Sequence, residues 1–127
     1  ATALLQHPLC EVIITGGQIQ RASGATVGAT AASQLEGIIF DQAFIGGCAM
    51  DPEMGLTGFD FADCAFKKAV IAQSNQTIVA LTADKLPGVA RFVVAKSRDI
   101  DVLVVDANIK QDVIDAFAAQ DVRIVCA

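Results

Sequence analysis

Residues 40–57 gather side chains and glycines of the kinds that bind small polar ligands. A carboxylate, three glycines and a hydroxyl lie within this stretch: Asp41, Gly46, Gly47, Gly55 and Thr57. A carboxylate accepts hydrogen bonds from ligand hydroxyls better than a neutral acceptor does, and glycine lets a ligand approach the backbone closely. Each glycine taken alone is also consistent with a turn, and Asp41 with a solvated strand end. Their combination favours a ligand site.

A second group of polar side chains follows the apolar run at residues 77–81. The loop of residues 82–88, Thr-Ala-Asp-Lys-Leu-Pro-Gly, brings a hydroxyl, a carboxylate and the Lys85 ammonium to the end of a predicted strand. In α/β proteins ligands bind beyond the carboxyl ends of strands, where loops and helix N-termini converge. We therefore expect Lys85 to line one pocket with the five residues of the first stretch and to contact an anion.

No motif of a common catalytic class or cofactor site is present in the sequence. Gly-x-Ser-x-Gly, the P-loop, Gly-x-Gly-x-x-Gly and His-Glu-x-x-His are all absent. The sole histidine, His7, precedes a proline and is expected to have a surface or packing role. The four cysteines form no Cys-x-x-Cys pair: Cys10, Cys48, Cys64 and Cys126. We expect no cofactor, no metal site, and free thiols in a reducing cytoplasm.

The composition predicts one compact α/β domain. The chain has 127 residues, of which 54% are hydrophobic and 18% charged, and no run reaches the roughly 20 apolar residues of a membrane helix. Abundant Ala, Val and Ile suit buried parallel strands packed beneath Ala-rich helices. The formal net charge is -5, so this segment offers no electrostatic surface for nucleic acid.

Hydrophobic patterns place the candidate residues on an alternating series of strands and helices. We predict strands at residues 11–15, 38–45, 77–81, 101–105 and 122–126, and helices at residues 27–35, from 60 or 63 to about 74, and 109–119. Residues 18–26 are predicted to be a loop, and residues 91–95 are apolar but of uncertain type. The alternation predicts a three-layer α/β structure, with a mostly parallel sheet and helices on both faces. Strands 77–81 and 101–105 are expected in its interior.

The ordered glycines and carboxylates resemble the C-terminal effector-sensing domain of DeoR-type bacterial transcriptional repressors. The matching positions run along nearly the whole chain: Gly16-Gly17, Gly28, Asp41-x-Ala43-Phe44-x-Gly46, Asp51, Gly55-Leu56-Thr57, Lys67-Lys68, Leu81 to Lys85 and Asp101 to Asp106. Between residues 28 and 85 the family spacing is kept without gaps. Each piece alone is a weak signal, whereas the ordered set is specific.

The resemblance implies the fold of ribose-5-phosphate isomerase and glucosamine-6-phosphate deaminase, adapted from catalysis to sensing. The implied ligand is a phosphorylated sugar or a related anionic metabolite, and the six residues named above are its candidate binding residues. Operator DNA is the implied partner of the whole protein, through an N-terminal winged helix-turn-helix outside this chain. The family's first strand-loop-helix, with its Gly-Thr-Thr phosphate loop, is also lacking, so we expect a C-terminal fragment. The family generally forms dimers or tetramers.

Three positions depart from the family pattern. Ala49 replaces a glycine, Thr82 stands where the family has an aspartate, and Leu86 replaces a phenylalanine. The first two changes touch the pocket and allow an effector other than a common sugar phosphate, or a looser pocket. Two alternatives stay open. One is a sugar-phosphate isomerase or deaminase with Asp41 as base and Lys85 as anion or oxyanion partner; the other is a bare structural or oligomerisation domain.

Overall fold

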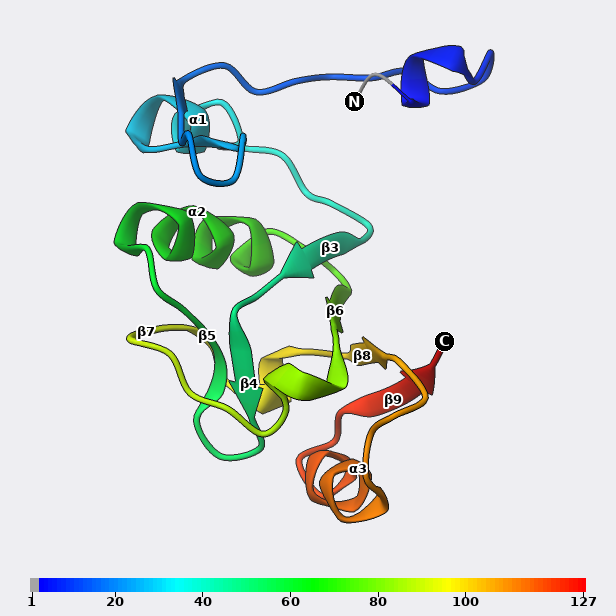
Figure 1. The fold of residues 1–127 in the computed structure, drawn as a ribbon. Coiled ribbons are helices and arrows are strands. Elements are labelled where there is room, and N and C mark those ends of the chain that lie inside the picture. The colour runs from blue at the N-terminus through cyan, green and yellow to red at the C-terminus, as the bar shows by residue number, and fades with distance from the viewer. Residues whose placement is uncertain (1–2) are drawn as a thin grey trace.

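A parallel sheet of four strands forms the centre of the computed structural model, which describes residues 3–127. The strand order is β3-β6-β8-β9 (Figure 1). These strands span Ala43–Gly46, Thr77–Leu81, Val102–Val105 and Arg123–Cys126. β6 and β8 are the two interior strands, which confirms the prediction made from their Ile, Val and Leu content.

Three further strands form an antiparallel sheet that the sequence patterns did not predict. β4 (Ala49–Asp51), β5 (Gly55–Gly58) and β7 (Phe92–Ala95) pair in the order β4-β5-β7. Only two residues, Gly47 and Cys48, separate β3 from β4, so the chain leaves the parallel sheet and enters the antiparallel one at the paired glycines. Residues 92–95, of uncertain type in the sequence, are therefore a strand.

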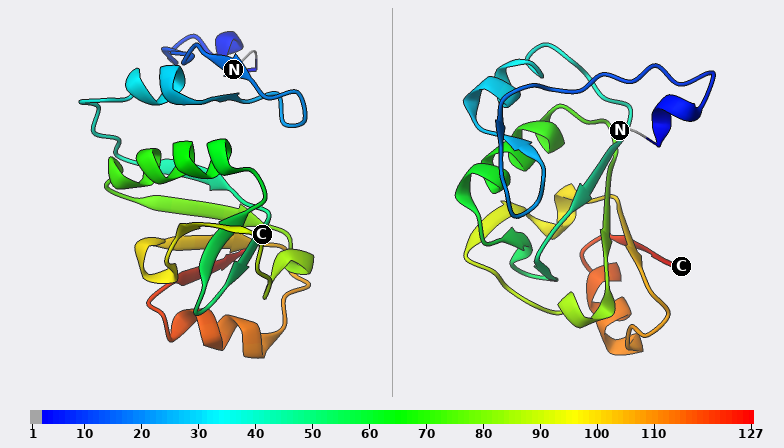
Figure 2. Two further views of the ribbon diagram at one scale, coloured as in Figure 1. Left: turned by 90° about the vertical axis from the view of Figure 1, so that its left-hand side faces the viewer. Right: turned by 45° about the horizontal axis from the view of Figure 1, so that its top comes forward.

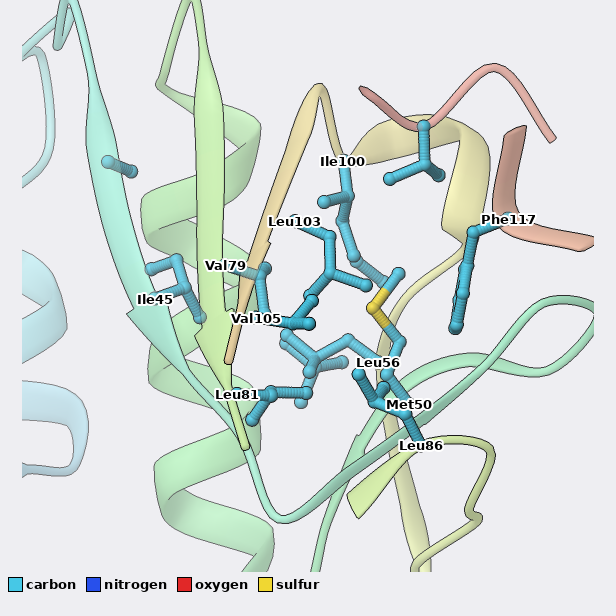
Figure 3. Close-up of a cluster of buried hydrophobic side chains, with 14 of the residues drawn as sticks. Ile45, Met50, Leu56, Val79, Leu81, Leu86, Ile100, Leu103, Val105 and Phe117 are labelled. Atoms are coloured by element: carbon cyan, nitrogen blue, oxygen red, sulfur yellow. The ribbon is translucent and has the colours of Figure 1, made fainter. Parts of the chain in front are cut away.

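Side chains from the two sheets pack into one hydrophobic core (Figure 3). Val79 and Leu103 come from the parallel sheet, Met50 and Leu56 from the antiparallel sheet, and all four are completely buried. Burying a side chain of this size stabilises a fold by about 1.5–3 kcal/mol relative to leaving it exposed. The core therefore fixes the strand ends from which the candidate loops leave.

Helices lie on both sides of the strands (Figures 1 and 2). α2 (Phe61–Ala72) begins at Asp60, whose carboxylate accepts a hydrogen bond from the Asp63 backbone N–H at 2.8 Å, as an N-cap aspartate does. α3 (Gln111–Ala118) buries Phe117 and packs against β9. Both helices were predicted from the sequence, and their positions on opposite sides of the strands confirm the three-layer α/β class.

The N-terminal third is built from short elements, two of which contact α2. These elements are the 3-10 helix η1 (Leu4–Gln6), the hairpin strands β1 (Gln18–Ile19) and β2 (Thr26–Val27), and α1 (Ala29–Ser33). β2 and α1 contact α2, and α1 is shorter than the predicted helix at residues 27–35. The hairpin lies largely within residues predicted to be a loop, because a pair of two-residue strands leaves no periodic signal.

Two predicted strands differ from the structure. Residues 11–15 form no strand within the described part of the chain, and Ile13 is 85% exposed. High β-propensity stabilises a strand only where a neighbour offers pairing and packing, and here none does. The predicted strand at residues 38–45 begins only at Ala43: the Ile38 N–H bonds to the Leu35 carbonyl in a turn, and Phe40 makes an isolated bridge to Ser74.

Candidate ligand site

The carboxyl edge of the parallel sheet carries a hollow of about 310 Å³. The register places Gly46 opposite Ala80, and Ala80 opposite Val104, so β3, β6 and β8 end at the same edge. The hollow is lined by the last residues of β6 and β8 and by the residues that follow them: Ala80, Leu81, Thr82, Lys85, Val104, Val105, Asp106 and Ala127. This edge is where an α/β sheet binds ligands.

Lys85 reaches this hollow from a short 3-10 helix, η2 (Ala83–Lys85). The Lys85 N–H donates to the Thr82 carbonyl at 3.0 Å, and the buried Leu86 that follows anchors the turn in the core. The Lys85 side chain is half-buried. Among residues 3–127 the only ion pair joins Lys67 to Asp63, so the Lys85 ammonium is available to an anion.

Asp106 lines the same hollow and was not among the residues that sequence reasoning selected. It directly follows β8, and its carboxylate accepts hydrogen bonds from the backbone N–H groups of Ala83 and Asn108, each at 2.9 Å. These two bonds, the Ala83 bond first, hold the pKa of the Asp106 carboxyl below its usual range. A carboxylate at the end of a predicted interior strand was the signal that would have identified it.

Gly46 and Gly47 lie at this edge but differ in what surrounds them. A Cβ built on Gly46 meets nothing within 4 Å, and Gly46 is exposed, so a ligand can approach its backbone. A Cβ on Gly47 would overlap Leu56 Cδ1. Gly47 is therefore required by the packing of the core beneath the edge.

Gly55 and Thr57 are buried in β5 and face no hollow described above. Gly55 has a φ of 80°, and a Cβ there would overlap the Ala95 carbonyl oxygen. The Thr57 hydroxyl donates to the Ala49 carbonyl at 3.1 Å and accepts from the Ala90 N–H at 2.7 Å, with no exposed surface. Both residues hold the antiparallel sheet together, and neither reaches the carboxyl edge.

Asp41 lies at the opposite end of β3 from Gly46. It precedes the strand, whose first residue, Ala43, pairs with Thr77 at the start of β6. At about 3.3 Å per residue, the strand itself separates Ala43 from Gly46 by roughly 10 Å, and Asp41 lies before Ala43. The structure thus brings Gly46, Gly47 and Lys85 to one edge of the sheet, and does not bring Asp41, Gly55 or Thr57 there; the predicted single pocket of six residues is corrected accordingly.

Other kinds of site have little support in the part of the chain that the structure describes. No group of three or more His, Cys, Asp or Glu side chains among residues 3–127 is arranged to hold a metal ion. Cys10, Cys48, Cys64 and Cys126 are unbridged. No helix within these residues has both the length and the apolar character needed to cross a membrane.

Comparison with known proteins connects this chain to bacterial and archaeal regulators. Residues 1–107 match the family described as DeoR C terminal sensor domain. The HTH-type transcriptional regulator GlpR of Haloferax volcanii is 30% identical over 102 residues, which are 80% of this chain and 40% of that protein. A putative aga operon transcriptional repressor of Escherichia coli O157:H7 is 25% identical over 125 residues, 98% of this chain and 46% of that protein. The chain thus spans less than half the length of these two relatives.

Proposed function

The chain belongs to the DeoR C-terminal sensor domain family and is a ligand-sensing regulatory domain; on this premise we propose that it binds a phosphorylated sugar or a related anionic metabolite through Lys85. The hollow at the carboxyl edge of β6 and β8 is the proposed site. Gly46 and Gly47 lie at the end of the neighbouring strand β3, at the same edge of the sheet. Gly55 and Thr57 support the site indirectly, through the sheet that packs beneath it.

One observation carries the proposal: an ammonium without an ion-pair partner in the described part of the chain lines a hollow at the ligand-binding edge of the sheet. A hydrogen bond from lysine to a charged group contributes about 1.5–3 kcal/mol, which corresponds to roughly ten- to a hundredfold in affinity.

For the whole protein we propose a transcriptional regulator that works in the cytoplasm as a dimer or tetramer. Relatives that extend beyond this chain are described as HTH-type transcriptional regulators and as a repressor. In this proposal a helix-turn-helix domain binds operator DNA, and the ligand changes its affinity for DNA because the two binding events are thermodynamically coupled. The domain is not an enzyme in this proposal, since its task is to change the population of DNA-bound protein.

Calorimetric titration of the protein with a panel of sugar phosphates tests the ligand proposal. Lys85→Ala should lower the affinity for the compound that binds by roughly ten- to a hundredfold. Lys96→Ala removes an exposed lysine outside the hollow and should leave the affinity for that compound unchanged. Equal affinities for wild type and Lys85→Ala would contradict the site. Steady conversion of the compound into another sugar phosphate would favour the isomerase or deaminase alternative.

A further inference from the structure

Two opposite charges line the hollow at the carboxyl edge without pairing with each other. Lys85 and Asp106 both contribute to its walls, yet the only ion pair within residues 3–127 is the one on α2. A site that presents a free ammonium and a free carboxylate complements a ligand with an anionic group at one end and hydrogen-bond donors at the other.

The Asp106 carboxylate is held in a fixed orientation. Its Oδ2 accepts from the Ala83 N–H and its Oδ1 from the Asn108 N–H, so one bond fixes each oxygen. A carboxylate offers about four acceptor positions, which leaves each oxygen able to accept one more hydrogen bond. An acceptor held in this way loses little side-chain entropy when a ligand binds.

We propose that Asp106 is the specificity-determining residue of the site, accepting a hydrogen bond from a hydroxyl or ammonium group of the ligand while Lys85 binds its anionic group. This inference rests on the proposed function and narrows the ligand to an anionic ester that carries a donor near the phosphate. A ligand with a second anionic group at that position is repelled by the carboxylate, which is ionised at neutral pH.

The other carboxylates near the candidate residues do not fit this role. Asp41 lies at the opposite end of β3. Asp84 is on η2 itself, but it lines a separate hollow of about 410 Å³ together with Pro87 and Lys110. Asp84 is therefore a matched control: it is an exposed carboxylate one residue from Lys85 that does not line the proposed site.

A series of ligands tests the inference on the wild-type protein alone. Inorganic phosphate and propyl phosphate carry the anion without a neighbouring donor, whereas glycerol 3-phosphate, ribose 5-phosphate and glucosamine 6-phosphate add hydroxyl or ammonium donors. At least one donor-bearing ester should bind about tenfold or more tightly than propyl phosphate, as expected for one hydrogen bond to a charged group. Equal affinities across the series would overturn the inference.

Variants then assign the discrimination to a residue. Asp106→Asn should lower the affinity for the donor-bearing ester about tenfold. The affinity for propyl phosphate should stay the same or rise slightly, because the variant lacks the carboxylate charge that repels the phosphate. Asp84→Asn should bind both esters as wild type does. Thermal unfolding in the absence of ligand checks that each variant is folded. The comparison of ligands on the wild-type protein tests the inference even if a variant does not fold.

The remaining outcomes separate this inference from the proposed function. If Asp106→Asn weakens both esters equally, Asp106 only positions the Lys85 loop; the inference is overturned and the phosphate site stands. If Lys85→Ala binds every ester as wild type does, the anion site itself is misplaced. If none of the five probes binds, both the inference and the proposed phosphate ligand are overturned.

Discussion

The Asp106 carboxylate accepts a hydrogen bond from the Ala83 backbone N–H at 2.9 Å, which ties the end of β8 to the loop that follows β6. The same carboxylate accepts from the Asn108 N–H, so one side chain fixes the loops that leave two adjacent parallel strands. Lys85 lies on the first of these loops. The Asp106 side chain, 21 positions later in the chain, therefore joins the Lys85 loop to the end of β8.

The first prediction concerns pH. Because the folded-state pKa of Asp106 lies below its ordinary value of 3.8, the ionised carboxylate stabilises the fold above that pH. The stabilisation is lost as the pH falls through the folded-state pKa. The difference in unfolding free energy between wild type and Asp106→Asn should thus be largest near neutral pH and shrink below pH 3.8. Urea unfolding, down to the lowest pH at which both proteins fold, measures it; a constant difference would contradict the account.

The second prediction concerns the buried hydroxyl of Thr57. Thr57→Val keeps the shape of the side chain but leaves the Ala90 N–H and the Ala49 carbonyl without their partner. The free energy of unfolding should fall by about 1–3 kcal/mol. Thr57→Ser, which keeps the hydroxyl and removes one methyl group, should lose only about 1 kcal/mol. A Thr57→Val protein as stable as wild type in urea unfolding would show that these bonds do not support β5.

The third prediction compares two glycines. Gly55→Ala places a side chain at a φ of 80° and against the Ala95 carbonyl, so it should destabilise the fold by at least about 2 kcal/mol. Gly46→Ala meets open space and should change stability by less than about 0.5 kcal/mol. Chemical unfolding of the two variants side by side measures the contrast. Similar losses for both would mean that β5 does not pack as described.

The fourth prediction concerns thiol reactivity. Cys10, Cys48 and Cys126 are exposed, whereas Cys64 is 3% exposed. Burial, with the nearby Asp63 charge, raises the pKa of the Cys64 thiol and leaves less of the reactive thiolate. A thiol reagent should therefore label three cysteines rapidly in the folded protein and a fourth only after denaturation without reductant. Two or fewer labelled thiols after denaturation would indicate a disulfide.

Much of the parallel half of the fold was predictable from local patterns. Residues 78–81 are a continuous apolar run that follows Thr77, and the structure forms β6 over residues 77–81, as predicted. Asp60 or Asp63 before an apolar helical face predicted the start of α2, and the structure shows that Asp60 is the cap. These elements carry their own signal, because a buried parallel strand is apolar throughout and a helix start needs a capping side chain.

The antiparallel sheet was not predictable in the same way. β4 and β5 have three and four residues, and β5 begins at a glycine that resembles a turn residue. β4 pairs with β5, and β5 pairs with residues 92–95, more than thirty positions later in the chain. The same dependence on partners explains residues 11–15, where β-branched side chains form no strand without a neighbour.

The candidate site residues were likewise predictable only where the strand that positions them was predicted correctly. Lys85 was selected because it follows a predicted interior strand, and Asp106 follows the other interior strand by the same rule. Asp41 was misjudged because the strand was predicted to begin at residue 38. Its actual start at Ala43 leaves Asp41 ahead of the strand, at the wrong end of the sheet.

The most direct test of the account is effector-dependent release of operator DNA by the whole protein that contains this chain. DNA binding is measured at rising concentrations of the compound that binds most tightly in the calorimetric titration, for wild type, Lys85→Ala and Asp41→Asn. Wild type and Asp41→Asn should respond alike, and Lys85→Ala should need roughly ten- to a hundredfold more effector. A folded, DNA-bound Lys85→Ala protein that responds as wild type does would contradict the account.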